Sequence, residues 1–131
     1  MDKLHPDARS KLMARVKNKN TSAEKQVRSM LFRAGLRFRL HSRRLPGSPD
    51  IVLPKHNTVV FVHGCFWHGH DCKRGKRPAS NESLWNKKID RNMERDTNAQ
   101  TKLLEMGWRV EVIWTCRILQ DTENLIMSLR T

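Results

Sequence analysis

A short segment near the middle of the chain concentrates side chains that bind metal ions or move protons. It runs from His63 to Cys72 as HGCFWHGHDC, and the remaining cysteine, Cys116, comes much later. Structural zinc prefers four thiolate and imidazole ligands in a closed tetrahedron. The spacing does not decide which of two histidines is the fourth ligand. The alternative to a zinc site is that these cysteines are ordinary reduced thiols and the histidines lie on the surface. The candidate zinc ligands are Cys65, Cys72, Cys116 and either His68 or His70.

Asp50 is a candidate ligand for a second metal ion. It follows Pro49 and opens the apolar run Ile51-Val52-Leu53. Enzymes that hydrolyse phosphodiesters hold Mg²⁺ on carboxylates, where the ion neutralises charge that develops on the phosphate. The alternative is a turn aspartate that caps the chain after a proline.

Two further acidic residues, Asp96 and Glu24, are candidates for a catalytic role. Asp96 falls on the same helical face as Ile89, Met93 and Leu103, and an inward carboxylate needs a partner. A histidine such as His63 or His68 would serve, since the carboxylate would orient the imidazole as a base. Glu24 follows Thr21 at the spacing of a helix capping box, which accounts for it without any catalytic role.

Aromatic side chains accompany basic ones in the same region. Phe66 and Trp67 precede a loop rich in lysine and arginine, and Trp85 lies at the start of the next predicted helix. Such aromatics either wedge between DNA base steps while cations hold phosphates, or pack under the loop as a small core.

The charge of the chain favours a polyanionic partner. Lys and Arg number 26 against 13 Asp and Glu, a net charge of +13. A domain this basic repels itself, so nucleic acid is the first candidate partner and an anionic membrane surface the second. Residues 1–16 lack the apolar core of a secretion signal, and no apolar run is long enough to span a membrane. We therefore expect a cytoplasmic, nucleoid-associated protein with no membrane partner.

Periodicity and turn residues predict the elements that must position these side chains. The predicted order is helix, three strands, helix, strand, helix, which indicates an α/β domain with a mixed central sheet flanked by helices. A basic N-terminal arm at 1–20 would precede a single domain at 21–131. The predicted helices are 22–34, 83–106 and 121–129, and the predicted strands are 36–40, 50–53, 58–63 and 108–114, with a loop at 64–80.

The motifs resemble those of the very short patch repair (Vsr) endonucleases. The resemblance rests on 45–50 (LPGSPD), 63–72 and 92–96 (NMERD), extended by 107–110 (GWRV) and 114–116 (WTC). It implies a fold like the type II restriction endonuclease core with a structural zinc site, in which Phe61-Val62-His63 stands where that core carries an acid-x-lysine triplet. It further implies a Mg²⁺-dependent monomer that nicks duplex DNA 5′ to the thymine of a T·G mismatch, which arises from deaminated 5-methylcytosine. Downstream repair proteins would act after the nick.

The resemblance also assigns roles to individual residues. It implies that Asp50 and the Val62 backbone carbonyl bind Mg²⁺, and that His68 activates water while Asp96 orients it. His63 would lie at the scissile phosphate with Glu24 nearby. The implied zinc ligands are Cys65, His70, Cys72 and Cys116, and the implied DNA-contacting residues are Phe66, Trp67, Trp85 and Met13.

Two other functions are compatible with parts of the pattern. A restriction-type endonuclease would cut an intact duplex and would normally act as a dimer. A zinc-stabilised DNA-binding module without catalysis would not need the combination of Asp50, His63, His68 and Asp96. The aromatic residues favour the mismatch enzyme, because unstacking costs least where base pairing is already faulty.

Overall fold

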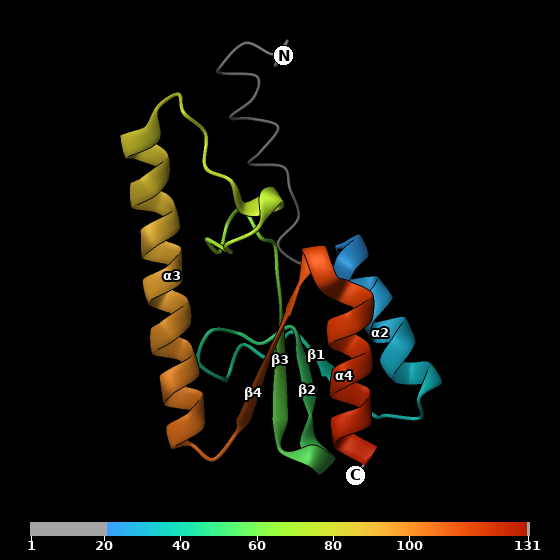
Figure 1. The fold of residues 1–131 in the computed structure, drawn as a ribbon. Coiled ribbons are helices and arrows are strands. Elements are labelled where there is room, and N and C mark those ends of the chain that lie inside the picture. Colours follow the sequence, from blue (N-terminus) through green and yellow to red (C-terminus); the bar gives the residue numbers. More distant parts are fainter. Residues whose placement is uncertain (1–20, 131) are drawn as a thin grey trace.

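The computed structural model describes residues 21–130, so the predicted basic arm, with Met13, lies outside the described residues. A four-stranded mixed sheet forms the middle layer (Figure 1). Helix α3 (Glu82–Glu105) covers one face, and α2 (Ser22–Arg33) and α4 (Ile118–Arg130) share the other. The predicted order of helices and strands and the α/β class are confirmed.

The capping residues of α2 are those that the sequence predicted. The Thr21 side chain accepts a hydrogen bond from the Glu24 backbone N–H at 3.2 Å, which satisfies one of the unpaired donors of the first turn. At the other end Gly35 adopts a φ of +82°. The N–H groups of Gly35 and Leu36 bond back to carbonyls of the last turn, a Schellman motif. The cap thus holds Glu24 in the first turn of a well-defined helix.

The sheet has the order β1-β2-β3-β4, with the bounds β1 (Arg39–Leu40), β2 (Ile51–Leu53), β3 (Thr58–His63) and β4 (Arg109–Trp114). β2 and β3 form the predicted antiparallel hairpin in the middle of the sheet, joined by a turn in which Asn57 is left-handed. β4 pairs with β3 in parallel after the α3 crossover. The start of β2 and the ends of β3 and β4 therefore meet at the same end of the sheet.

The first strand is shorter than predicted. The alternation over 36–40 predicted a strand along the whole stretch, but only its last two residues pair with β2. Leu36 is buried and closes the C-terminal turn of α2 instead. The pairing extends one residue further along the chain, since the His41 N–H donates to the Asp50 carbonyl at 3.0 Å. This places His41 directly beside Asp50.

The last helix begins earlier than predicted. The prediction placed its start at Asp121, whereas α4 begins at Ile118, directly after the 3-10 turn Thr115–Arg117. Asp121 lies inside the first turn, where its carboxylate accepts the Trp114 N–H at 3.4 Å and pairs with Arg117. The Asp121 side chain therefore supports the junction between β4 and α4. The prediction had used Asp121 only as the first residue of the helix.

Both faces of the central strands are buried, which explains their uninterrupted apolar sequence. On β3, Val60 faces the layer of α2 and α4, while Val59 and Phe61 face α3. The core on the α2 and α4 side contains Val27, Leu31, Ile51, Leu53, Val60, Ile113 and Leu125. The core on the α3 side contains Val52, Val59, Phe61 and Leu103. The sheet is therefore packed against helices on both faces.

Candidate active site

A cleft of about 1090 Å³ opens at the end of the sheet where β2 begins and β3 ends. Its walls come from the first turn of α2, the residues around the start of β2, the loop after β3 and the middle of α3. The predicted residues that line it are Glu24, Asp50, Val62, His63, Trp67, His68 and Asp96. The fold thus brings together all the predicted catalytic residues and the predicted Mg²⁺-binding backbone from segments that are distant in sequence.

Asp50 lies just before β2, against the end of β3. Its Oδ2 accepts a hydrogen bond from the Val62 N–H at 2.7 Å. Burial raises the pKa of Asp50 to about 6, and although the Val62 hydrogen bond lowers it, the nearby Glu24 charge raises it further. A largely buried carboxylate beside a second one is stabilised by a cation. The carboxylate and carbonyl oxygens at this end of the sheet therefore fit Mg²⁺, which prefers oxygen ligands.

His68 and Asp96 form a dyad across the cleft from α2. The Nδ1 atom of His68 lies 2.5 Å from Oδ2 of Asp96, and about a quarter of each side chain is exposed. The partner that an inward-facing Asp96 needs is thus the His68 imidazole from the loop after β3. The carboxylate orients the ring with a proton on Nδ1, which leaves Nε2 free to accept another.

His63 packs behind His68. The two rings are parallel, with centroids 3.7 Å apart, and Trp114 contacts His63 edge-on. His63 is 4% exposed, and within residues 21–130 its buried Nδ1 has no hydrogen-bond partner. Burial, together with the His68 charge, lowers the pKa of His63 to about 4. His63 is therefore neutral near pH 7, with one ring nitrogen that the described chain does not satisfy.

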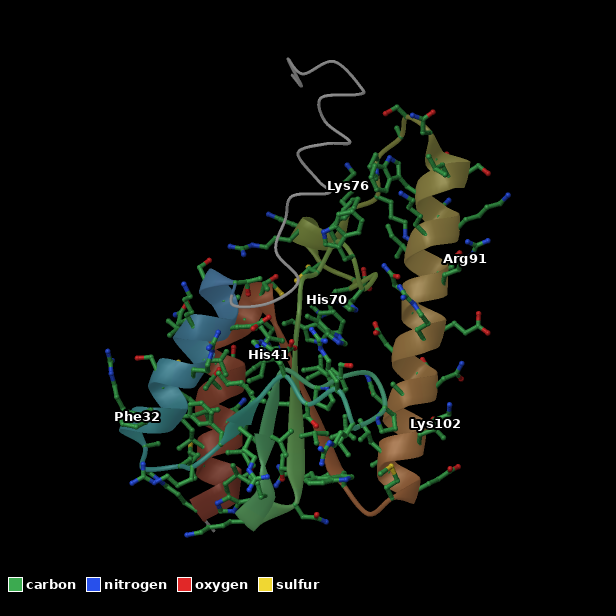
Figure 2. The ribbon with its side chains drawn as sticks, turned by 180° about the vertical axis from the view of Figure 1, so that it is seen from behind. Phe32, His41, His70, Lys76, Arg91 and Lys102 are labelled. Atoms are coloured by element: carbon green, nitrogen blue, oxygen red, sulfur yellow. The ribbon has the colours of Figure 1, made fainter. Side chains whose placement is uncertain are left out.

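Glu24 has a tertiary partner that the sequence analysis missed. Its Oε2 lies 2.9 Å from Nε2 of His41, and Arg28 approaches the same oxygen at 3.7 Å. His41 lies at the end of the sheet below the loop that carries His70 (Figure 2). The alternation before His41 marked it as the exposed position of a strand. Only its pairing with Asp50 identifies it as a cleft residue.

Four predicted zinc ligands gather beside the cleft. One donor atom from each of Cys65, His70, Cys72 and Cys116 lies within 4.8 Å of the others, and Cys116 Sγ is 3.5 Å from His70 Nδ1. Burial opposes ionisation of Cys65, but hydrogen bonds from Thr115 and the neighbouring cysteines lower its pKa to about 6. Three sulfurs and one imidazole at this spacing fit a tetrahedral zinc ion. His68 is not part of this group, because Asp96 holds it.

The predicted aromatic residues form one cluster beside the cleft. Phe66, Trp67 and Trp85 contact one another edge to face, with centroids 5.1 to 5.9 Å apart. Each is only half-buried, and the Trp67 carbonyl accepts a hydrogen bond from Asn92 of α3 at 2.9 Å. The cluster packs as a small core under the loop and also presents aromatic surface to solvent, so the two sequence interpretations are compatible.

Basic side chains continue from this cluster along α3. A second hollow is lined by Trp67 together with Lys88, Arg91 and Arg95. Figure 2 shows Arg91 and Lys102 projecting from the helix away from the sheet.

Among residues 21–130, none of the helices has the length and apolarity needed to cross a membrane.

Comparison with known proteins identifies the family. Residues 1–74, more than half of the chain, match the family model described as DNA mismatch endonuclease Vsr. The chain belongs to the Vsr family. Relatives of this Vsr chain include the DNA mismatch endonuclease Vsr of Escherichia coli, which is 42% identical over 119 residues, covering 90% of this chain and 76% of that protein.

Other Vsr relatives carry a different description. The type II nicking enzyme V.XorIIP of Xanthomonas oryzae is 50% identical over 129 residues, covering 98% of this chain and 94% of that protein. The type II nicking enzyme V.NmeAIP of Neisseria meningitidis is 46% identical over 110 residues, covering 84% and 79%. The resemblance that the motifs indicated is thus confirmed at the level of the Vsr family.

Proposed function

We propose that the protein is a Mg²⁺-dependent endonuclease that nicks one strand of duplex DNA 5′ to the thymine of a T·G mismatch. The observation that carries the proposal is that Asp50, hydrogen-bonded to Val62, and the His68–Asp96 dyad share one cleft. A carboxylate suited to a divalent ion and an oriented imidazole are the two parts that phosphodiester hydrolysis needs. The relatives named as a mismatch endonuclease and as nicking enzymes support the same reaction.

In this proposal each cleft residue has its own role in hydrolysis. Asp50 and the Val62 carbonyl hold Mg²⁺, which when bound would neutralise charge on the phosphate and lower the pKa of water. His68 Nε2 takes a proton from the attacking water, and Asp96 stabilises the imidazolium through the bond at 2.5 Å. His63, which stacks on His68, lies at the scissile phosphate, and Glu24 supports the Asp50 side of the cleft.

The zinc cluster and the aromatic cluster are assigned to substrate binding. Zinc on Cys65, His70, Cys72 and Cys116 would hold the loop so that His68 faces Asp96. Phe66, Trp67 and Trp85 would insert beside the mismatched pair, where unstacking costs least. We further propose a single endonuclease domain at 21–131, related to the type II restriction endonuclease core, that acts on DNA as a monomer before other repair proteins.

A cleavage assay tests this proposal directly. Zinc-loaded protein is incubated with Mg²⁺ and end-labelled duplexes that differ in one T·G pair, with each strand labelled in turn. We expect one nick, 5′ to the mismatched thymine, and no cut in the other strand. Equal cleavage of the matched duplex would instead favour a restriction-type enzyme, and binding without cleavage would favour a DNA-binding module.

Two substitutions locate the chemistry. Asp50→Asn should reduce the nicking rate by at least about 10³-fold, and Asp96→Asn by about 10²–10⁴-fold, the range for an impaired general base. Glu105→Gln is the control, because Glu105 is an exposed carboxylate at the C-terminal end of the same helix. Full activity of the Asp50 variant would remove this residue from the proposed metal site.

A further inference from the structure

Three potential ligand groups converge at the α2 side of the cleft. One donor atom from each of Glu24, His41 and Asp50 lies within 4.8 Å of the other two. Glu24 is 3% exposed, and its Oε2 is 2.9 Å from His41 Nε2. The backbone bond between the His41 N–H and the Asp50 carbonyl fixes the two residues side by side. The group is therefore built by sheet pairing and a capped helix, and does not rest on chance surface contacts.

We propose that His41 is a nitrogen ligand for the divalent ion held by Asp50, so that this site prefers Mn²⁺ over Mg²⁺. The inference rests on the proposed function in taking Asp50 as a metal ligand. First-row transition-metal ions accept an imidazole ligand more readily than Mg²⁺, which keeps to oxygen ligands and gives up water reluctantly, and Mn²⁺ is the ion of that series best suited to the two carboxylates. A site with one imidazole and two carboxylates would hold either ion, with the transition metal bound more tightly.

The distance between Glu24 and His41 suits coordination. Adjacent ligands on an octahedral ion with bonds of about 2.1 Å stand about 3 Å apart, and the Glu24 and His41 atoms are already 2.9 Å apart. An ion would replace the proton that now joins them, which is released to solvent as the ion binds. The two carboxylates of Glu24 and Asp50 supply the negative charge that a divalent cation needs, and the Arg28 guanidinium lies 3.7 Å from the Glu24 carboxylate.

Metal binding by the zinc-loaded protein without DNA tests the inference. Mn²⁺ binding is followed by the electron paramagnetic resonance signal of the free ion, and Mg²⁺ binding by competition against Mn²⁺. We expect His41→Gln to weaken Mn²⁺ binding roughly tenfold and to change Mg²⁺ binding by less than about twofold, because only a nitrogen ligand is lost. His56→Gln makes the same change in the turn between β2 and β3, at the opposite end of the sheet, and should alter neither.

A second measurement detects the atoms bound to the ion directly and does not depend on a binding constant. Pulsed electron resonance of bound Mn²⁺ in protein with ¹⁵N-labelled histidine should show coupling to one directly bound imidazole nitrogen, and His41→Gln should remove it. Absence of that coupling in the unsubstituted protein would overturn the inference, as would equal weakening of both ions by His41→Gln. Since neither readout involves DNA, a failed nicking assay with intact nitrogen coupling would reject the proposed function and leave this inference standing.

Discussion

Burial shifts the pKa values of Asp50 and His63 in opposite directions, and in both cases it favours the neutral form of the side chain. It raises the pKa of the Asp50 carboxyl to about 6 and lowers that of the His63 imidazole to about 4. In both side chains the charged form is disfavoured, because the cleft replaces water with protein atoms. A cation beside Asp50 would reverse the effect on that residue. The metal-free protein should therefore carry a measurable cost for keeping Asp50 ionised.

Asp50→Asn should stabilise the Mg²⁺-free protein, and the gain should depend on pH. The folded-state pKa of about 6 exceeds the ordinary value of 3.8, so between these values the folded state binds more protons than the unfolded one. Stability from this residue is then lost as pH rises, and the loss is complete above about pH 7. We expect a gain on the order of 1–3 kcal/mol at pH 7.5, with little gain near pH 4, measured by urea unfolding.

The comparison controls for other titrations. His63 has a depressed pKa, so its contribution to stability falls as pH drops from about 6.5 to 4. This contribution is present in both proteins and cancels in the difference. The Val62 N–H can still donate to the amide oxygen of asparagine. A gain that is equally large at pH 4 would assign the effect to packing and not to charge.

The loop between β3 and α3 has few buried residues to hold its shape. Only Cys65 and Gly75 are fully buried within 64–81, and the rest is half-buried or exposed. A Cβ on Gly75 would lie 1.9 Å from the His70 carbonyl oxygen and 3.2 Å from that of Cys65. The backbones of two predicted zinc ligands thus close around this glycine, and neither can move away without disturbing the cluster.

Gly75→Ala should weaken zinc binding, because the added methyl group separates the loop from the ligands it carries. We expect zinc retention against a chelator to fall by about tenfold or more, as outer-shell changes at metal sites do. The measurement is metal content after graded chelator treatment. Gly64→Ala is the matched control, since its Cβ would meet only Trp67 at an ordinary 3.8 Å. Unchanged zinc retention in the Gly75 variant would contradict the proposed Cys₃His site.

The layers of the molecule place the two halves of the cleft on opposite sides of the sheet. Glu24 comes from the α2 layer and Asp96 from the α3 layer, while Asp50 lies at the end of the sheet between them. Basic residues line the hollow on the outer side of the aromatic cluster, and the chain carries a net charge of +13. A polyanion that crosses the cleft would therefore meet cations over a wide area.

DNA affinity should fall steeply with salt. If about five phosphates are neutralised, the dissociation constant should rise on the order of 10²–10³-fold between 50 and 200 mM salt, because condensed counterions are released on binding. Fluorescence anisotropy with Ca²⁺ in place of Mg²⁺ measures this without cleavage. A matched duplex should show a similar slope, since phosphate contacts carry no sequence information. A flat salt dependence would contradict binding that is dominated by phosphate contacts.

Local patterns were sufficient for most of the elements. Thr21 and Gly35 set the ends of α2, Gly107 ends α3, and two apolar runs around Asn57 form the hairpin. Caps, turns and periodicity involve only a few neighbouring residues, so they can be recognised directly in the sequence. At the junctions between elements, as at Leu36 and Asp121, the predicted boundary was wrong by a few residues.

The composition of the site depended on contacts between distant segments. The spacing of histidines left His68 and His70 equivalent, and the fold separates them because Asp96 of α3 binds one while Cys116 approaches the other. His41 carried no local sign of function, and the register of β1 on β2 alone sets it beside Asp50. Strand register and helix packing are set by burial of the whole core, so no short stretch of sequence encodes them.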